Sequence, residues 1–257
     1  MRGLNLQITR MAGLIALLAC LIFVPGCSED PKSPSDPGPT PIPTRSLLVF
    51  YPFNGNALDE SGNDYNTTLI GEPPPSVSTF LTIGDNNYQA LSVHYTVLQG
   101  MGDFTISVWG RITTLHYNHF IISGARGGTD GLDNIIYIAY IPGSSTWQCY
   151  IRPTDAKFGP SVSMKDLEWH HIVFVRNGSV GRFYIDNKEI GDGAAVGGAA
   201  INIASGGLIV GQDQDNVGGG FERNQSWAGD IDNYRIYSRA LTRSEIRALY
   251  EETEWGD

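Results

Sequence analysis

Acidic and amide side chains gather around a run of glycines near the end of the chain, in the stretch VGQDQDNVGGGFERNQSW at residues 210–227. Asp213 and Asp215 are two residues apart, so an extended backbone points both carboxylates to the same side. The glycine run that follows lets the chain fold back, which would bring Glu222 and Gln225 over the same point. Calcium prefers about six to eight oxygen ligands from carboxylates, amides, carbonyls and water. The stretch therefore predicts a calcium site.

Two other interpretations of this stretch were considered. A polar, glycine-rich surface loop without a metal has the same composition, and this alternative stays open. In an EF-hand, Asp213, Asp215 and Gly218 would fit the first, third and sixth loop positions. Val217 and Asn224 would then occupy positions that need oxygen ligands, and no helices are predicted on either side. We therefore reject the EF-hand.

The elements that must position these residues are predicted to be β-strands. From Leu47 to about Glu251, short runs rich in β-branched and aromatic residues are separated by Gly, Asn, Asp or Pro, which indicates strands joined by turns. The predicted strands are Leu48–Phe53, Phe104–Ile112, Phe120–Ser123, Ile135–Tyr140, Trp147–Ile151, Trp169–Arg176, Arg182–Ile185, Leu208–Val210 and Ile231–Tyr237. Many short strands without intervening helices predict an all-β, antiparallel, two-sheet jelly-roll sandwich.

Turn and helix signals complete this prediction. Asn177-Gly178 and Asp186-Asn187 separate predicted strands and tolerate positive φ, so each predicts a tight hairpin turn. Near the end of the chain, Thr242–Glu245 has the spacing of a capping box, and an apolar stripe follows it. One short C-terminal helix is therefore expected.

The first 46 residues are predicted to direct and tether the domain. Residues 1–26 combine basic residues with a short apolar run, which is typical of a signal peptide. The ending Val-Pro-Gly-Cys resembles a bacterial lipobox, so Cys27 is the predicted lipidation site; an ordinary secretory signal cut nearby is the alternative. Residues 27–46 read as a proline-rich tether and 47–257 as the folded domain. Ser28 after the cysteine favours the outer membrane or cell surface over the inner membrane.

The overall charge excludes one class of partner. The chain carries 27 acidic and 17 basic residues, for a net charge of −10. Such a chain lacks the basic patch that nucleic acid requires, so no nucleic-acid partner is expected. The membrane is expected to be contacted through the lipid anchor only.

Several phrases resemble a known family of domains. LVFYPFNGNALDESGNDYN, FTISVWGRI, WHHIVFVRNGSVGRFYIDNKEIG and GDIDNYRIYSRALTRSEIRALY resemble the laminin-G-like domains of the concanavalin-A-like superfamily. The resemblance covers nearly the whole predicted domain and implies the curved two-sheet sandwich. It says little about the ligand, because one fold serves many functions.

The glycine-rich stretch is also similar to the calcium loop of the pentraxins. The family adds an Asp-Asn pair placed just before a strand, and the phrase GLDNIIYI supplies one here. The resemblance implies two calcium ions held by the side chains of Asp133, Asn134, Asp213, Asp215, Glu222 and Gln225 and by the backbone carbonyl of Gln214. The family usually has Glu where Asp213 stands, so the shorter side chain is expected to weaken one ion or to leave a water in its place.

In pentraxins the ions form part of the binding face. The resemblance therefore implies a calcium-dependent, lectin-like module that binds a glycan or a phosphorylated head group. Ala139 stands where the family's choline pocket has an aromatic residue, so phosphocholine specificity is not expected. The family is often pentameric, which makes a homo-oligomer a possible partner arrangement.

Two other classes of function were weighed. Glucanases of this superfamily resemble one another in a Glu-x-Asp-x-x-Glu strand, and the nearest match here, Asp230 and Asp232, lacks both glutamates. The chain is therefore expected not to be an enzyme. A metal-independent adhesive or structural surface protein, which binds other proteins or glycans, remains the alternative.

Overall fold

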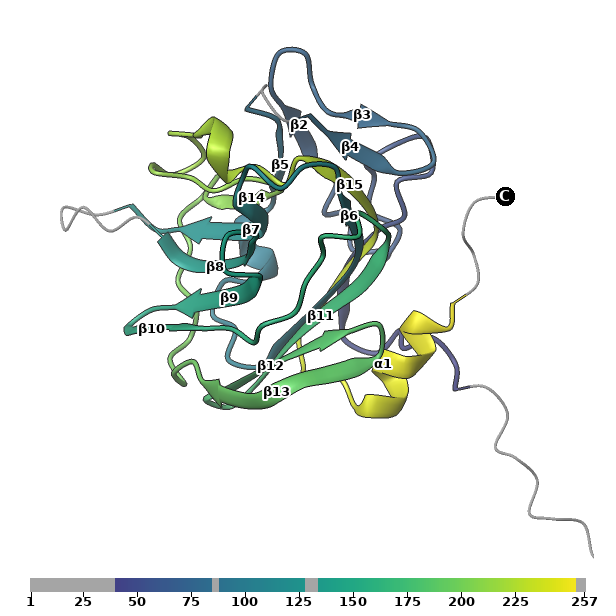
Figure 1. Ribbon diagram of the computed structural model, residues 1–257, viewed down its shortest axis with the longest axis vertical. Helices are drawn as coiled ribbons and strands as arrows, with labels where there is room; N and C mark the ends of the chain where they lie inside the picture. Colours follow the sequence, from purple (N-terminus) through teal and green to yellow (C-terminus); the bar gives the residue numbers. More distant parts are fainter. Residues whose placement is uncertain (1–39, 85–87, 128–133, 253–257) are drawn as a thin grey trace, which may run out of the picture. The chain divides into compact units, whose positions relative to one another are not determined.

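Two antiparallel β-sheets account for most of the structure, a computed structural model that describes residues 40–84, 88–127 and 134–252. The first sheet has the order β13 (Lys188–Ala195), β12 (Val180–Ile185), β11 (His170–Asn177), β6 (Phe104–Ile112), β15 (Gly229–Tyr237), β4 (Leu81–Ile83) and β3 (Ser76–Val77), with β1 (Leu47–Tyr51) also paired to β15. The second has the order β10 (Thr154–Phe158), β9 (Thr146–Ile151), β8 (Asn134–Ile141), β7 (His119–Ala125), β14 (Leu208–Val210), β5 (Ala90–Val93) and β2 (Thr68–Ile70). The sheets face each other as two layers (Figure 1).

Strand β15 organises the first sheet. One of its edges pairs with β6. The other edge is shared: Gly229–Ile231 pairs with β4, and the part from Tyr234 to Tyr237 pairs with β1. The N-terminal and C-terminal ends of the domain are therefore joined within one sheet.

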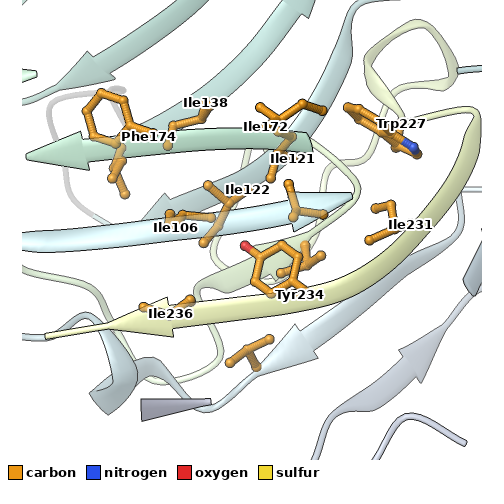
Figure 2. Close-up of a cluster of buried hydrophobic side chains, with 14 of the residues drawn as sticks. Ile106, Ile121, Ile122, Ile138, Ile172, Phe174, Trp227, Ile231, Tyr234 and Ile236 are labelled. Atoms are coloured by element: carbon orange, nitrogen blue, oxygen red, sulfur yellow. The ribbon is translucent and has the colours of Figure 1, made fainter. Parts of the chain in front are cut away.

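The core lies between the sheets and follows the two-residue period of the strands. Along β6, the side chains of Phe104, Ile106, Val108 and Ile112 are all buried in it, as the alternating sequence predicts. Figure 2 shows Phe174 and Tyr234 from the first sheet beside Ile122 and Ile138 from the second. Trp227 is also fully buried there. Burial of apolar surface at about 25 cal/mol per Å² makes this core the main source of stability.

The predicted hairpins and the predicted helix are present. The β11–β12 turn lies one residue later than predicted, because Asn177 pairs with Val180 and the turn is formed by Gly178, at φ 60°, and Ser179. Asp186 and Asn187 both have positive φ, at 49° and 58°, and connect β12 to β13 in a two-residue turn. The helix α1 (Arg243–Tyr250) begins after Thr242, whose hydroxyl accepts the N–H of Glu245, while the Glu245 carboxylate accepts the N–H of Thr242. Hydrogen bonds from Arg239 lower the pKa of Glu245 to about 2.

Helix α1 covers the outer face of the first sheet (Figure 1). Its Ile246 and Leu249 pack against Val173 and Tyr237 on the surface that faces away from the core. Ile42 joins the same cluster, so the segment before β1 lies on this side of the sandwich. Short 3-10 helices at Tyr95–Val97 and Arg223–Gln225 are the remaining helical elements of the described residues.

The predicted all-β sandwich is confirmed. The strands not predicted are β2–β5, β10 and β13, and for all of these but β10 the sequence shows why. Each of the nine predicted runs overlaps an observed strand. β2, β3, β4 and β5 are only two to four residues long, too short to show a period. β13 has the sequence KEIGDGAA, whose two glycines and small residues resemble a loop.

Gly110 offers a test of how tightly Trp227 and Ile172 pack against the inner side of β6. A Cβ at this position would lie 2.5 Å from Cζ2 of Trp227 and 3.2 Å from Cδ1 of Ile172. Gly110→Ala is therefore expected to lower the free energy of unfolding by about 1–3 kcal/mol, measured by urea denaturation. Gly102 has open space around its Cα, so Gly102→Ala should change stability by less than about 0.5 kcal/mol. Equal effects of the two substitutions would contradict the packing described here.

Candidate functional site

The glycine-rich stretch forms a loop that is closed at its base by main-chain hydrogen bonds; we call residues 211–227 the 211–227 loop. Gly211, at φ +83°, turns the chain away from β14. The N–H of Trp227 donates to the carbonyl of Gly211 at 2.8 Å, and the N–H of Asp213 donates to the carbonyl of Gln225 at 3.0 Å. The two ends of the loop are therefore held together before any metal binds.

Gln214 fastens the loop to the outer face of the second sheet. Its side chain is fully buried, and its Nε2 donates to the carbonyls of Ser123 and Gly207 and to the Ser123 hydroxyl at 3.0–3.2 Å. Its Oε1 accepts the N–H of Gly218 at 2.8 Å. The side chain is thus occupied in structural bonds, and the predicted ligand atom of Gln214 is its backbone carbonyl.

Asp213 and Asn134 meet although 79 residues separate them. Nδ2 of Asn134, the first residue of β8, donates to Oδ1 of Asp213 at 2.9 Å. Asp213 is only 5% exposed. Burial first, and then the negative charges of Asp215 and Glu222, raise the pKa of its carboxyl group to about 6 against the opposing effect of its hydrogen bonds. The two segments that the calcium prediction relies on are therefore in contact.

Two buried side-chain oxygens of these segments lack hydrogen-bond partners. They are Oδ1 of Asn134 and Oε1 of Gln225, and the main chain of Gln225 is bonded to that of Asp213. A buried acceptor without a partner is costly, so such atoms are uncommon. Together with the desolvated carboxylate of Asp213, they form a set of hard oxygens of the kind that calcium prefers. The residues present fit a calcium ion.

The structure does not bring every predicted ligand into one cluster. Asp215 and Glu222 are exposed, and no three His, Cys, Asp or Glu residues of the described chain lie close enough together to hold a metal. Asp133 lies outside the described residues. The contacts thus join Asn134, Asp213 and Gln225, while Asp215 and Glu222 act on Asp213 through their charge.

An aromatic cluster adjoins Asp213 on the outer face of the second sheet. Phe120, Tyr137 and Tyr150 pack together with Ala139, and the rings of Tyr137 and Tyr150 are stacked at 5.3 Å. Burial, followed by the charge of Asp213, raises the pKa of Tyr137. Ala139 is fully buried within the cluster.

Two residues that support the loop were not singled out from the sequence. Ser123 donates its hydroxyl to the carbonyl of Gln212 at 2.8 Å, and Oε1 of Gln212 accepts the N–H of Asp213 at 3.1 Å. Ser123 is the one hydroxyl residue in the run HFIISGA of β7, and this polar residue in a buried strand is the signal that could have found it.

The carboxylates considered for glycosidase chemistry lie on the outer face of the first sheet. Asp230 accepts two hydrogen bonds from Arg111, at 2.6 and 3.0 Å, and one from the Thr82 hydroxyl at 2.8 Å. Burial raises the pKa of Asp232 to about 6, and its Oδ1 is buried without a partner. The carboxylate of Asp230 is neutralised by its ion pair with Arg111, and the carboxyl group of Asp232 is desolvated.

The predictions for the N-terminal region fall outside the described residues. The signal peptide and Cys27 lie there, so both remain predictions. Within the residues that the structure describes, no helix is long and apolar enough to cross a membrane.

The chain belongs to the concanavalin A-like lectin/glucanases superfamily, because the model of a family of that description matches residues 84–247. Among its relatives, human pentraxin-4 is 30% identical over 92 residues, which cover 35% of this chain and 19% of that protein. Rat neuronal pentraxin-1 is 32% identical over 88 residues, which cover 34% of this chain and 20% of that protein. The chain therefore spans about a fifth of the length of these relatives.

Solved structures with the same fold include parts of enzymes. Domain 4 of a GH43 extracellular arabinanase from Geobacillus stearothermophilus has a TM-score of 0.59 at 16% identity and covers 80% of this chain and 98% of that chain. A mutant Trypanosoma rangeli sialidase with trans-sialidase activity has a TM-score of 0.61 at 17% identity. The match covers 84% of this chain and 34% of that chain.

The sequence-based expectation that this chain is not an enzyme is wrong, because the fold does not exclude enzymes. The arabinanase and the sialidase are enzymes, and each contains this fold. The missing Glu-x-Asp-x-x-Glu strand excludes one catalytic arrangement, and it does not exclude every chemistry on the fold. At this level of identity the likeness shows the fold alone, so no catalytic residue is transferred.

The raised pKa of Asp213 predicts a pH dependence of the metal-free protein. The folded state holds this proton more tightly than the unfolded state, whose carboxyl has an ordinary pKa of 3.8. The stability from Asp213 is therefore fully present below pH 4 and lost as the pH rises through about 6. The full loss is on the order of 3 kcal/mol.

Asp213→Asn isolates this effect, because the variant cannot titrate at this position. In calcium-depleted buffer, urea denaturation between pH 4.5 and 7.5 should show wild type losing stability relative to the variant as the pH rises. Parallel curves for the two proteins would contradict the buried, desolvated state of Asp213.

Proposed function

We propose that the 211–227 loop binds calcium and that the domain uses this face to bind a glycan or a phosphorylated group. The observation that carries the proposal is the contact between Asp213 and Asn134, with unpaired buried oxygens on Asn134 and Gln225 beside it. The resemblance of both segments of the site to the pentraxin calcium site adds support.

In this proposal, each residue has a defined task. Asp213, Asn134 and Gln225 would hold calcium with side-chain oxygens, and Gln214 would add its backbone carbonyl. Asp215 and Glu222, which are exposed, would complete the ligand set together with Asp133. Bound calcium would supply a positive centre that accepts hydroxyl, carboxylate or phosphate oxygens of a ligand. Two ions remain the expected number.

A saccharide is the favoured ligand class. Domain 4 of the arabinanase, which this chain covers almost completely, was solved in complex with arabinotriose. Calcium coordinates neighbouring hydroxyl oxygens of the kind that sugars offer. The cluster of Phe120, Tyr137 and Tyr150 is buried and lies near Asp213, so it supports this face of the sheet from within.

The melting temperature of the full-length protein tests the metal site. Calcium added to metal-depleted protein is expected to raise it by several degrees, and the rise should grow with calcium concentration as mass action requires; at 100 times Kd the stabilisation is about 2.7 kcal/mol. Asp215→Asn should remove most of the rise. Asp192→Asn, which neutralises an exposed carboxylate in β13, should leave it intact.

The ligand is tested on the same proteins. Binding to a panel of neutral and acidic glycans should require calcium in the wild type and should be weakened by Asp215→Asn. If calcium does not change the melting temperature, the metal site is refuted. The metal-independent adhesive protein would then be the remaining interpretation. Binding to glycans that is equal with and without calcium would refute the use of the ion for recognition.

We also propose that Cys27 carries a lipid that anchors the protein to the cell envelope, facing outward. The support is the lipobox-like ending of the predicted signal peptide and the proline-rich tether after it. Cys27→Ser is expected to move the expressed protein from the membrane fraction to the soluble fraction, whereas Cys149→Ser should not. Wild-type protein in the soluble fraction would contradict the anchor.

A further inference from the structure

A cavity of about 460 Å³ opens at one end of the second sheet. β7 ends, β8 begins and β9 ends at this point, because Ala125 pairs with Asn134 and Ile136 pairs with Ile151. The segment between β13 and β14 closes the other side through Ala199 and Asn202. A volume of this size accommodates one or two sugar residues.

Arginine dominates the polar lining of this cavity. Arg126, just after β7, and Arg152, just after β9, both line it. None of the described lining residues is acidic, although the chain as a whole has a net charge of −10. Two arginines that line one space on an acidic protein concentrate positive charge there.

The guanidinium of Arg152 has an unused donor. Its Nε is buried and has no hydrogen-bond partner. Its Cζ lies 5.8 Å from the centre of the Tyr150 ring, which holds the side chain across an aromatic surface. A buried N–H of a charged group without an acceptor is costly, so the site favours an incoming oxygen ligand.

A third arginine stiffens the wall. Arg176 of β11 is fully buried, and its Nη2 donates to the carbonyls of Gly197 and Ala199 at 2.7 and 2.6 Å. Its Nε and Nη1 have no hydrogen-bond partner. The main chain at Ala199, which lines this side of the cavity, is therefore bonded to another positively charged side chain.

The remaining polar group of the lining also acts as a donor. The Asn202 Oδ1 accepts a hydrogen bond from Nε2 of Gln99 at 2.9 Å. This contact fixes the amide so that its Nδ2 is the group left to donate. Guanidinium and amide donors around one space match a carboxylate or sulfate, which offers acceptors only.

We propose that this cavity binds the carboxylate or sulfate group of an acidic glycan through Arg152, Arg126 and Asn202, without the help of calcium. The choice of a glycan as the carrier rests on the proposed function, which the inference deepens by defining a charged sugar as the ligand. Ile135 in the lining of the cavity directly follows Asn134 of the candidate calcium site in β8.

Calorimetric titration of the full-length protein with trigalacturonate in calcium-depleted buffer tests the site. The neutral galactose trimer is the control ligand. Trigalacturonate is expected to bind at least about tenfold more tightly than the neutral trimer, and inorganic sulfate should compete with it, because charge-assisted hydrogen bonds to oxyanions supply the selectivity. Equal binding of the two trimers, or no competition by sulfate, would overturn the proposal.

Substitutions of the arginines test whether the acidic trimer binds in this cavity. Arg152→Gln and Arg126→Gln should each weaken trigalacturonate binding by about tenfold, and Arg152→Lys, which keeps the charge without the planar fork, should weaken it less. Arg182→Gln, which removes an equal charge from β12, should have no effect. Equal losses for Arg182→Gln and Arg152→Gln would overturn the proposal, and unchanged melting temperatures ensure that the variants are folded.

Asp215→Asn separates this site from the proposed calcium function. The variant should retain full trigalacturonate binding in calcium-depleted buffer. If calcium fails to stabilise the wild type while the arginine variants still lose the acidic trimer, the calcium proposal fails and the oxyanion site stands. Loss of trimer binding in Asp215→Asn would overturn the independence of the oxyanion site.

Discussion

Trp227 connects the 211–227 loop to the core of the sandwich. Its indole ring is fully buried between the sheets, and its Nε1 donates to the carbonyl of Asp230 at 2.9 Å. Its main-chain N–H closes the loop on Gly211, and its carbonyl accepts a hydrogen bond from His119. The loop can therefore carry a concentrated set of acidic and amide groups while the core keeps its base in place. A desolvated carboxylate such as Asp213 depends on this support, since burial of a charge is costly.

At this end of the sandwich, the acidic and the basic side chains lie on different elements. Asp213, Asp215 and Glu222 are carried by the loop, whereas Arg126 and Arg152 come from the ends of β7 and β9. The described lining of the arginine cavity contains no carboxylate. The domain thus carries two regions of different charge, one suited to a cation and the other to an anion.

The fold and part of the site could be predicted from the sequence. The alternating side chains of β6 and the capping box at Thr242 are local patterns, and they correctly indicated a strand and a helix. The pairing of Asn134 with Asp213 depends on strand order, and the sequence indicated it only through resemblance to pentraxins. The arginine cavity was not predicted, because Arg126, Arg152 and Asn202 are far apart in the chain and meet only through the register of three strands. The exclusion of enzymes failed because it used one missing motif against a fold that serves many functions.

The segment before β1 and the 211–227 loop lie on opposite sides of the sandwich. Ile42 packs beside helix α1 on the outer face of the first sheet, and the Tyr237 hydroxyl donates to the carbonyl of Pro43 at 3.1 Å. The 211–227 loop lies on the outer face of the second sheet, where Gln214 bonds Ser123. The two outer faces of the domain therefore differ: the first is covered by the domain's own helix and by its first described residues, whereas neither of these elements covers the loop on the second.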